Sequence, residues 1–384
     1  MTRREFIALS AALLAGCAPL PQATETPAPS PTKGIVMTPT QDNLDVMIGQ
    51  ILMVGFRGFE VNDASPIARD LRERHMGSVV LFDYDVATQK RERNVKSPAQ
   101  VKQLCAALQK IAPTKLLIAI DQEGGKVARL TERYGFPATV SQQTLGTKND
   151  LAYTRQVADT TAKTLADAGI NLNLAPAVDL NTNPNNPVIG KIERSFSADA
   201  NVVTNHAREL MQAHHARHVL TTLKHFPGHG SSKDDSHLGF VDVTQTWART
   251  ELEPYRKIIA AGECDTVMTA HVFNANLDPK LPATLSKNII TGILRDELKF
   301  DGVVITDDMG MGAISQNYGF EYAIELALNA GVDMLALANN SDPFDENIAT
   351  RAHTAIKRMV NEGKVPRARI EQAYRRVSKL KARL

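Results

Sequence analysis

The sequence predicts an α/β protein folded as a single (β/α)8 TIM-type barrel, with its active site at the carboxyl ends of the strands. Eight short apolar runs alternate with amphipathic segments, which is the pattern of parallel strands joined by crossover helices. Polar clusters follow several of these runs, and in a parallel barrel the carboxyl ends of all strands meet on one face. A closed barrel also removes both sheet edges. A doubly wound open sheet is the alternative.

The predicted strands begin with the run ILMVGF at residues 51–56. A short helix precedes it, predicted from apolar side chains at helical spacing, Leu44, Met47, Ile48 and Ile51. The other strands are predicted at residues 78–82, 117–120, 170–178, 220–223, 266–270, 302–306 and 333–337. Helices are predicted at 98–111, 153–168, 201–216, 246–261 and 322–330, with terminal helices at 348–359 and 367–380.

Residues 1–17 have the pattern of an export signal, in which two arginines precede an apolar run and small residues lead to Cys17. A cysteine at that boundary resembles the bacterial lipoprotein signal, and the paired arginines resemble a twin-arginine signal. We therefore expect acylation of Cys17 and a lipid anchor in a bacterial membrane of the cell envelope. An ordinary cleaved secretory peptide is the alternative. Residues 18–40, rich in Pro, Thr and Ser, predict a disordered tether, and residues 41–384 form the barrel domain.

Composition argues against several classes of protein. Lys and Arg number 44 against 42 Asp and Glu, so the chain lacks the excess positive charge of a nucleic-acid-binding protein. Beyond the signal only Cys105 and Cys264 remain; they give no disulfide framework, and we expect both to be buried and inert. No second stretch is apolar enough to span a bilayer.

The stretch KHFPGHGSSKDDSH, residues 224–237, holds three histidines and two aspartates. Asp235 and His237 are spaced so that the carboxylate can orient the imidazole for general acid/base chemistry near neutral pH. A surface loop with incidental charges is the alternative. The neighbouring His225 and His229, with an aspartate of this stretch and His237, could instead bind zinc. The Pro-Gly break between His225 and His229 argues against the helical face on which such spacing is usually found.

Further acidic and basic residues follow the predicted strands. Asp307, in VVITDDMGM, could serve as a nucleophile or cap a helix, a task that Asp308 could also perform; both interpretations stay open. DQEGGKVAR begins at Asp121 and places a Gly pair before a predicted helix. Asp121 could accept hydrogen bonds from two sugar hydroxyls. Arg194, in IERSFS, is either a solvated charge or a rigid clamp with several donors.

Seven motifs together, DQEGGKVAR, NTNPNNPVIG, IERSFS, KHFPGHG, DDSH, MTAHV and ITDDMGM, closely resemble glycoside hydrolase family 3, specifically its bacterial β-N-acetylhexosaminidases. The resemblance covers residues 44–339. It implies a (β/α)8 barrel and a retaining mechanism through a covalent glycosyl-enzyme, without metal or cofactor. By the same resemblance Asp307 is the nucleophile, and His237 is the acid/base with Asp235 as its partner. The residues implied to hold N-acetylglucosamine are Asp121, Arg129, Arg194, Lys224 and His225.

A histidine suits this role because its neutral form deprotonates water without placing a second negative charge beside the incoming nucleophile. It would also tolerate phosphate as the acceptor, so phosphorolysis stays open. The β-glucosidases of the family resemble longer chains that have a second α/β domain and lack the Asp-Ser-His signature. We expect no such domain here, because only two terminal helices follow the eighth run.

The sequence thus favours a retaining exo-β-N-acetylglucosaminidase that acts as a monomer on peptidoglycan fragments or related amino-sugar glycans. Two other classes stay open. One is a metal-dependent barrel hydrolase that uses His225, His229 and His237. The other is a glycan-binding envelope protein without catalytic activity. His229 has no assigned role in the favoured interpretation.

Overall fold

The computed structural model describes residues 44–91 and 93–384. The predicted export signal (1–17), its lipidation site Cys17 and the predicted tether (18–40) lie outside the described residues, so they stay predictions. Within the described part of the chain, no helix combines the length and apolarity needed to cross a membrane.

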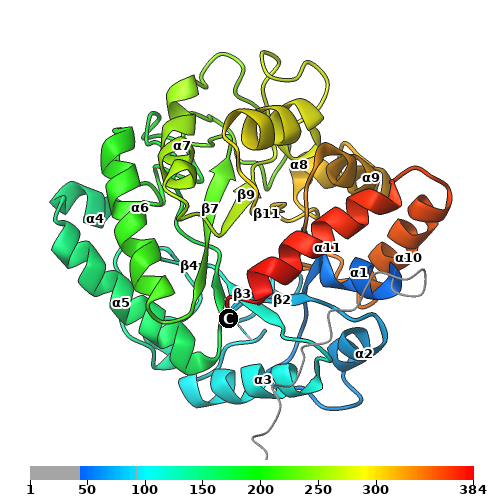
Figure 1. The fold of residues 1–384 in the computed structure, drawn as a ribbon. Coiled ribbons are helices and arrows are strands. Elements are labelled where there is room, and N and C mark those ends of the chain that lie inside the picture. Colours follow the sequence, from blue (N-terminus) through cyan, green and yellow to red (C-terminus); the bar gives the residue numbers. More distant parts are fainter. Residues whose placement is uncertain (1–43, 92) are drawn as a thin grey trace, which may run out of the picture. The chain divides into compact units, whose positions relative to one another are not determined.

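Eight parallel strands form the central sheet, and helices surround it (Figure 1). In sheet order the strands are β11 (Val303–Ile305), β9 (Thr266–Thr269), β7 (Leu220–Phe226), β6 (Leu172–Asn173), β3 (Leu117–Ile120), β2 (Ser78–Leu81), β1 (Leu52–Gly55) and β12 (Leu335–Leu337). A bridge between Ile305 and Met334 joins the two end strands, and the Thr306 N–H donates to the Met334 carbonyl at 3.0 Å. The sheet therefore closes into the predicted barrel, and the open sheet is not formed.

The fourth predicted strand, at residues 170–178, pairs regularly only over β6. Proline at position 176 has no N–H to donate and interrupts the ladder. The chain nevertheless continues beside β7, because Ala177 forms a parallel bridge with Lys224 and the Val178 N–H donates to the Lys224 carbonyl at 2.7 Å. This irregular continuation carries Asp179 to the carboxyl end of the barrel.

One helix precedes the first strand, and the others lie between and after the strands. They are α1 (Leu44–Gln50), α2 (Pro66–Glu73), α3 (Pro98–Ile111), α4 (Gln142–Lys148), α5 (Leu151–Ala168), α6 (Ala200–His215), α7 (Glu253–Ala260), the π-helix η5 (Asn288–Glu297), α8 (Gly312–Ser315), α9 (Phe320–Ala330), α10 (Ile348–Asn361) and α11 (Arg367–Lys381). Polar caps start several of them: the Asp150 carboxylate accepts from the Tyr153 N–H at 3.0 Å, and the Ser97 hydroxyl accepts from the Gln100 N–H at 3.2 Å. The predicted helix at 246–261 is shorter, because a 3-10 turn (Arg249–Leu252) precedes α7.

The helix predicted after the Gly pair of DQEGGKVAR is wrong. Residues 122–128 form an antiparallel hairpin of β4 (Gln122–Gly124) and β5 (Val127–Ala128). Gly124 and Gly125 have φ of 101° and 58°, a backbone conformation that turns the chain back and that glycine adopts without steric cost. The side chain of Gln122 holds the hairpin closed, since its Oε1 accepts from the N–H groups of Arg129 and Leu130 at 2.9 and 3.0 Å.

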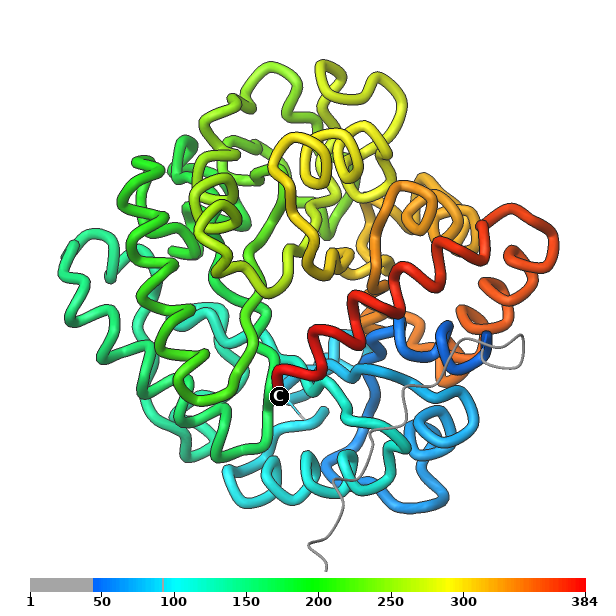
Figure 2. The backbone as a smooth tube through the Cα atoms, viewed as in Figure 1, coloured from blue at the N-terminus to red at the C-terminus, as the bar shows by residue number. Residues whose placement is uncertain are grey.

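The strands are buried along their whole length in β1, β2 and β3, which explains why their sequences are almost continuously apolar. The first and last helices, α1 and α11, pack side by side, as Figure 2 shows in blue and red. Buried Asp333, just before β12, accepts hydrogen bonds from Arg295 and Arg369 at 2.5 Å each. It also accepts from the Val304 N–H at 3.0 Å, so it links η5 and α11 to the closing strands.

Candidate active site

A cavity of about 360 Å³ lies at the carboxyl ends of the strands. Its lining comes from strands around the whole barrel, including Met53 of β1, Met268 of β9 and Ala336 of β12. Seven of the eight residues predicted for the site line it, namely Asp121, Arg129, Arg194, Lys224, His225, His237 and Asp307. The eighth, Asp235, is hydrogen-bonded to His237. The structure therefore brings all eight residues to one place.

Lys224 lies between two carboxylates at the base of the cavity, with 2% of its side chain exposed. Its Nζ is 2.7 Å from Asp121 Oδ1 and 2.6 Å from Glu123 Oε1. Burial by itself lowers the pKa of Lys224, but the two carboxylates outweigh burial and raise it. Asp121 also contacts Arg129 Nη2 at 3.3 Å. Burial acts to raise the pKa of Asp121, but Lys224 and Arg129 outweigh burial and lower it. The carboxylate therefore stays ionised.

Arg194 is fixed by a two-pronged contact with Glu123, whose oxygens accept from Nε and Nη2 at 2.8 and 2.7 Å. Its Nη1 donates to the Val188 carbonyl at 2.9 Å. Burial acts to raise the pKa of Glu123, yet the charges of Arg194 and Lys224 lower it to about 2. The guanidinium is therefore held in one orientation at the wall of the cavity.

Asp179 fixes the backbone and one side chain at the carboxyl end of β7. Its Oδ2 accepts from His225 Nδ1 at 2.7 Å, and its Oδ1 accepts from the backbone N–H groups of His225 and His229 at 3.2 and 2.7 Å. Because Arg194 Nη2 donates to His225 Nε2 at 3.0 Å, the ring proton of His225 is on Nδ1. Burial raises the pKa of Asp179, but His225 and His229 outweigh it and the pKa falls to about 2.

Asp307 follows β11, lines the cavity and is partly exposed. Its Oδ1 accepts from the Asp308 N–H at 2.8 Å. Burial would raise the pKa of Asp307, but the nearby imidazoles of His225, His271 and His237 outweigh burial and lower it. An ionised carboxylate at a strand end, open to the cavity, has the protonation state that a nucleophile requires.

Asp308 does not cap a helix, so that interpretation is wrong. The next helix, α8, begins at Gly312, and Met311 occupies its N-cap position without a side-chain hydrogen bond. Asp308 Oδ1 instead accepts from the N–H groups of Ala338 and Gly310 at 2.9 and 3.1 Å. Burial raises the pKa of Asp308 to about 6. The residue thus joins the segment after β11 to the end of β12 and supports the backbone around Asp307.

Asp235 and His237 lie on the loop after β7. Asp235 Oδ1 accepts both from the His237 N–H at 2.8 Å and from His237 Nδ1 at 2.7 Å. The side chain of His237 is 60% exposed, and that of Asp235 is 25% exposed. The Asp235 carboxylate therefore fixes Nδ1 of the His237 imidazole and leaves Nε2 to exchange a proton with a ligand or with water.

Comparison with known protein families decides the identity of this barrel. Residues 43–380 match the model of the glycosyl hydrolase family 3 N-terminal domain. The chain belongs to glycosyl hydrolase family 3. The predicted resemblance is thereby confirmed.

Relatives within family 3 include a β-hexosaminidase A of Pseudoalteromonas piscicida, 34% identical over 379 residues that cover 88% of this chain and 61% of the relative. A β-hexosaminidase of Xylella fastidiosa (strain M23) is 38% identical over 297 residues, covering 74% of this chain and 84% of that protein. The chain therefore spans only about three fifths of the first of these relatives.

Solved structures place the chain in the same family. A family 3 β-N-acetylglucosaminidase from Paenibacillus sp. str. FPU-7 superposes with a TM-score of 0.80 and 38% identity, over 88% of this chain and 62% of that one. A β-N-acetylhexosaminidase from Beutenbergia cavernae DSM 12333 has a TM-score of 0.76 and 31% identity, over 88% and 98% of the two chains. The names of these neighbours match the predicted branch of the family.

His229, one of the three histidines considered as zinc ligands, does not line the cavity of this family 3 barrel. Both of its ring nitrogens are hydrogen-bonded, Nδ1 to Ser232 Oγ at 2.8 Å and Nε2 to Ser236 Oγ at 3.1 Å. Both nitrogens of His225 are likewise engaged, by Asp179 and Arg194. Among the described residues, no group of three or more His, Cys, Asp or Glu side chains is arranged to hold a metal ion. The geometry therefore does not favour the zinc alternative.

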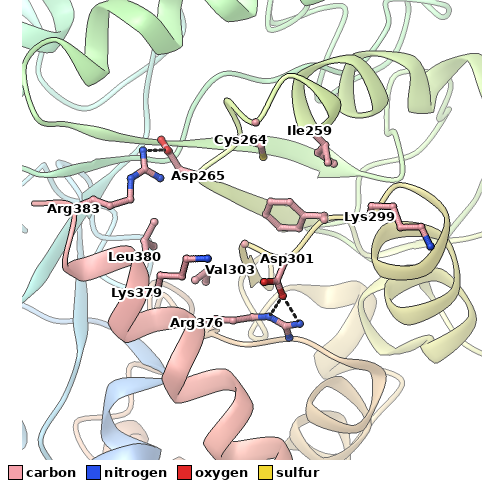
Figure 3. A pocket seen from close by; sticks show the side chains of 13 residues that line it. Ile259, Cys264, Asp265, Lys299, Asp301, Val303, Arg376, Lys379, Leu380 and Arg383 are labelled. Atoms are coloured by element: carbon pink, nitrogen blue, oxygen red, sulfur yellow. Dashed lines mark hydrogen bonds and ion pairs between the residues drawn. The ribbon is translucent and has the colours of Figure 1, made fainter. Parts of the chain in front are cut away.

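A second cavity, of about 250 Å³, lies at the opposite end of the barrel, where β9 and β11 begin (Figure 3). Its carboxylates are paired with arginines, Asp265 with Arg383 at 2.6 Å and Asp301 with Arg376 at 2.9 Å. Cys264 lines it and is partly exposed, contrary to the expected burial. Burial nevertheless raises the pKa of the Cys264 thiol well above its usual value. The carboxylates and thiol of this cavity are thus poorly suited to catalysis.

Two acids of the site, Asp179 and Glu123, were not among the residues predicted from the sequence. Both are buried, and each holds a predicted sugar-binding residue in place. Asp179 could have been found from its position, because it follows the fourth apolar run as Asp121 follows the third. Glu123 belongs to DQEGGKVAR and precedes its Gly pair, but nothing in the local sequence indicates its contact with Arg194.

Proposed function

We propose that this family 3 protein is a retaining exo-β-N-acetylglucosaminidase that removes terminal N-acetylglucosamine from peptidoglycan fragments or related amino-sugar glycans. One observation carries the proposal: a single cavity holds the ionised carboxylate of Asp307, the imidazole of His237 and a fixed set of hydrogen-bonding groups. The relatives named β-hexosaminidase A and β-N-acetylglucosaminidase support the choice of sugar.

In the first step, Asp307 attacks the anomeric carbon and forms a covalent ester with the sugar. The bond between this carbon and the leaving oxygen breaks, and His237 gives its proton to that oxygen. Asp235 stabilises the imidazolium and holds the ring through Nδ1. The aglycone then leaves with the proton.

In the second step, the neutral imidazole of His237 takes a proton from water. The water oxygen attacks the anomeric carbon on the face that the aglycone occupied before it departed. The ester bond to Asp307 breaks and the carboxylate is restored. Two inversions at one carbon give net retention. His237 is again protonated, so the enzyme returns to its starting state.

The sugar is held by groups whose orientations are already fixed. Asp121 and Lys224 present an acceptor and a donor at the base of the cavity, and Arg194 and His225 form one wall. Arg129 also lines the cavity with a side chain that is 27% exposed. The exposed part of its guanidinium offers further donors to a sugar oxygen.

We further propose that Cys17 carries the lipid that anchors the protein as a monomer to a bacterial membrane of the cell envelope. The support is the sequence pattern of residues 1–17. Mass spectrometry of the amino terminus, taken from a membrane extract, should find an acylated Cys17. An unmodified cysteine in a soluble pool would refute the anchor.

The proposed activity is tested with an aryl β-N-acetylglucosaminide. Wild-type protein should release the phenol and give the β-anomer of the free sugar first, as followed by proton NMR. Asp307→Ala should lower kcat by at least roughly 10⁴-fold, because the covalent route is lost. Equal rates for the two proteins would refute the nucleophile, and activity abolished by a chelator would favour the metal-dependent alternative.

A further inference from the structure

His229 is buried next to the catalytic loop, residues 231–240, which carry Asp235 and His237. It takes no part in the mechanism above. Its side chain bridges two serines of that loop, Ser232 at 2.8 Å and Ser236 at 3.1 Å. Ser236 is the residue between Asp235 and His237. Burial lowers the pKa of His229 to about 4, so at neutral pH the ring has one donor and one acceptor, which two hydroxyls can match.

The backbone of His229 is fixed to the barrel. Its N–H donates to Asp179 Oδ1 at 2.7 Å, and its carbonyl accepts from Asn186 Nδ2 at 2.7 Å. Asp179 also holds His225, a predicted sugar-binding residue. The backbone of His229 is therefore held by the same carboxylate that holds His225.

On its other side the loop is attached to α8, which follows the strand of the nucleophile. The Ala313 N–H donates to the Ser236 carbonyl at 3.1 Å, and the Gly312 N–H donates to the His237 carbonyl at 3.2 Å. Ser236 is thus bonded on both sides, through its hydroxyl to His229 and through its carbonyl to α8.

Asp235 and His237 flank Ser236, and their side chains are 25% and 60% exposed. We propose that His229 is a positioning residue, which places the Asp235–His237 pair over the cavity by holding Ser236 and Ser232. This role rests on the proposed function. It matters because proton transfer requires donor and acceptor atoms about 2.6–3.2 Å apart, and a displacement of about 1 Å can slow a reaction roughly 100-fold.

The first test compares leaving groups. Phenyl β-N-acetylglucosaminide needs a proton on its leaving oxygen, whereas the 2,4-dinitrophenyl glycoside scarcely does. His229→Ala should lower kcat/KM roughly 10- to 100-fold for the phenyl substrate and by less than about fivefold for the dinitrophenyl one. His237→Ala, which removes the acid itself, is the reference and should show a larger loss in the same direction.

A second readout concerns the base role. Azide attacks the glycosyl-enzyme without giving up a proton, so it should raise kcat of His229→Ala on the dinitrophenyl substrate. Ser236→Ala removes one of the two bonds and should show the same selectivity, to a smaller degree. His229→Gln retains one donor and one acceptor and should recover part of the phenyl activity.

The matched control is His206→Ala. His206 is also buried and bonded through both nitrogens, to Thr154 at 2.8 Å and Asn149 at 3.2 Å, between helices α5 and α6. This variant should lower stability and leave the ratio of the two substrates unchanged. Equal losses of His229→Ala on both substrates, with no effect of azide, would show a merely structural role and overturn the proposal.

Hydrogen–deuterium exchange tests the positioning without reference to activity. Backbone amides of residues 231–240 should exchange faster in His229→Ala than in wild type, while those of β7 should not. If wild-type protein cleaves neither glycoside, the proposed function fails, and exchange alone decides whether His229 holds the loop. Unchanged exchange in this segment would overturn the inference in either case.

Discussion

Each of the three histidines in residues 224–237 has different partners and hence a different task. His225 is held by Asp179 and Arg194, His229 bridges two serines, and His237 pairs with Asp235. The roles of the outer two are predicted from the sequence, His225 by the resemblance to the family and His237 also by its acid two residues away. The role of His229 could not be predicted from sequence, because its hydrogen bonds to two serines exist only once the loop has folded against it.

The two missed acids show the same limit at single residues. Glu123 is needed because Lys224 and Arg194 would otherwise be buried close together without enough negative charge. Sequence shows which residues can be charged, but the pairing between residues 71 positions apart depends on the tertiary fold.

Glu123→Gln should strongly destabilise the protein, because it leaves two buried cations with one fewer carboxylate. Breaking such a pair costs about 3–5 kcal/mol, and KM for an aryl glycoside should rise as Arg194 loses its orientation. Urea unfolding measures the first effect and steady-state kinetics the second. Glu321→Gln is the control, since Glu321 and Arg358 are each 50% exposed and such pairs contribute about 0–1 kcal/mol. Similar losses in both variants would contradict the buried network.

At the scale of elements, apolar runs predicted all eight strands because each strand is buried along its length. Local periodicity was less informative where glycine sets the backbone. In DQEGGKVAR the Gly pair turns the chain into a hairpin, and the carboxamide of Gln122 closes it. This hairpin, rather than a helix, brings Arg129 back beside Asp121.

Gly124→Ala should distort that hairpin. A Cβ at this position would lie 2.2 Å from the Val140 carbonyl oxygen, and φ is 101°. The backbone conformation alone costs about 1–2 kcal/mol for a residue other than glycine, and displacement of Arg129 should raise KM. Thermal unfolding and kinetics measure the two effects.

Gly292→Ala, in η5, is the control for this substitution. Apart from its chain neighbours and the backbone of its own helix, no atom of the described residues lies within 4 Å of the added Cβ, so stability should stay the same or rise by up to about 1 kcal/mol. A Gly124 variant that behaves like the Gly292 variant would show that the turn tolerates a side chain.

At the scale of the whole molecule, the two ends of the barrel are specialised differently. The carboxyl ends carry the cavity, whereas near the amino ends Asp333 joins η5 and α11 to the closing strands. Closure was predictable from the absence of sheet edges in such a fold. The arginines that secure it were not, because they come from segments far apart in sequence.

Stability should depend on pH through Glu251, a buried acid beside the catalytic loop whose Oε2 accepts from the Gly230 N–H at 3.2 Å. Burial raises its pKa from 4.5 to about 8. Between these values the unfolded chain binds fewer protons than the folded one, so the free energy of unfolding falls as pH rises. The loss should reach on the order of 4 kcal/mol.

Urea unfolding from pH 4.5 to 8 measures this effect against Glu251→Gln, which has no titrating group at the position. The variant should gain stability relative to wild type as pH rises. Parallel curves for the two proteins would show that Glu251 is ionised in the folded state.

The base of the cavity balances its own charge. Three acids, Asp121, Glu123 and Asp179, lie among three bases, Arg129, Arg194 and Lys224 (with His225 between Asp179 and Arg194). An uncharged sugar entering this site meets strong local dipoles from these paired charges at the base of the cavity. Recognition can therefore rest on the directions of hydrogen bonds, and binding the sugar need not take up or release counterions.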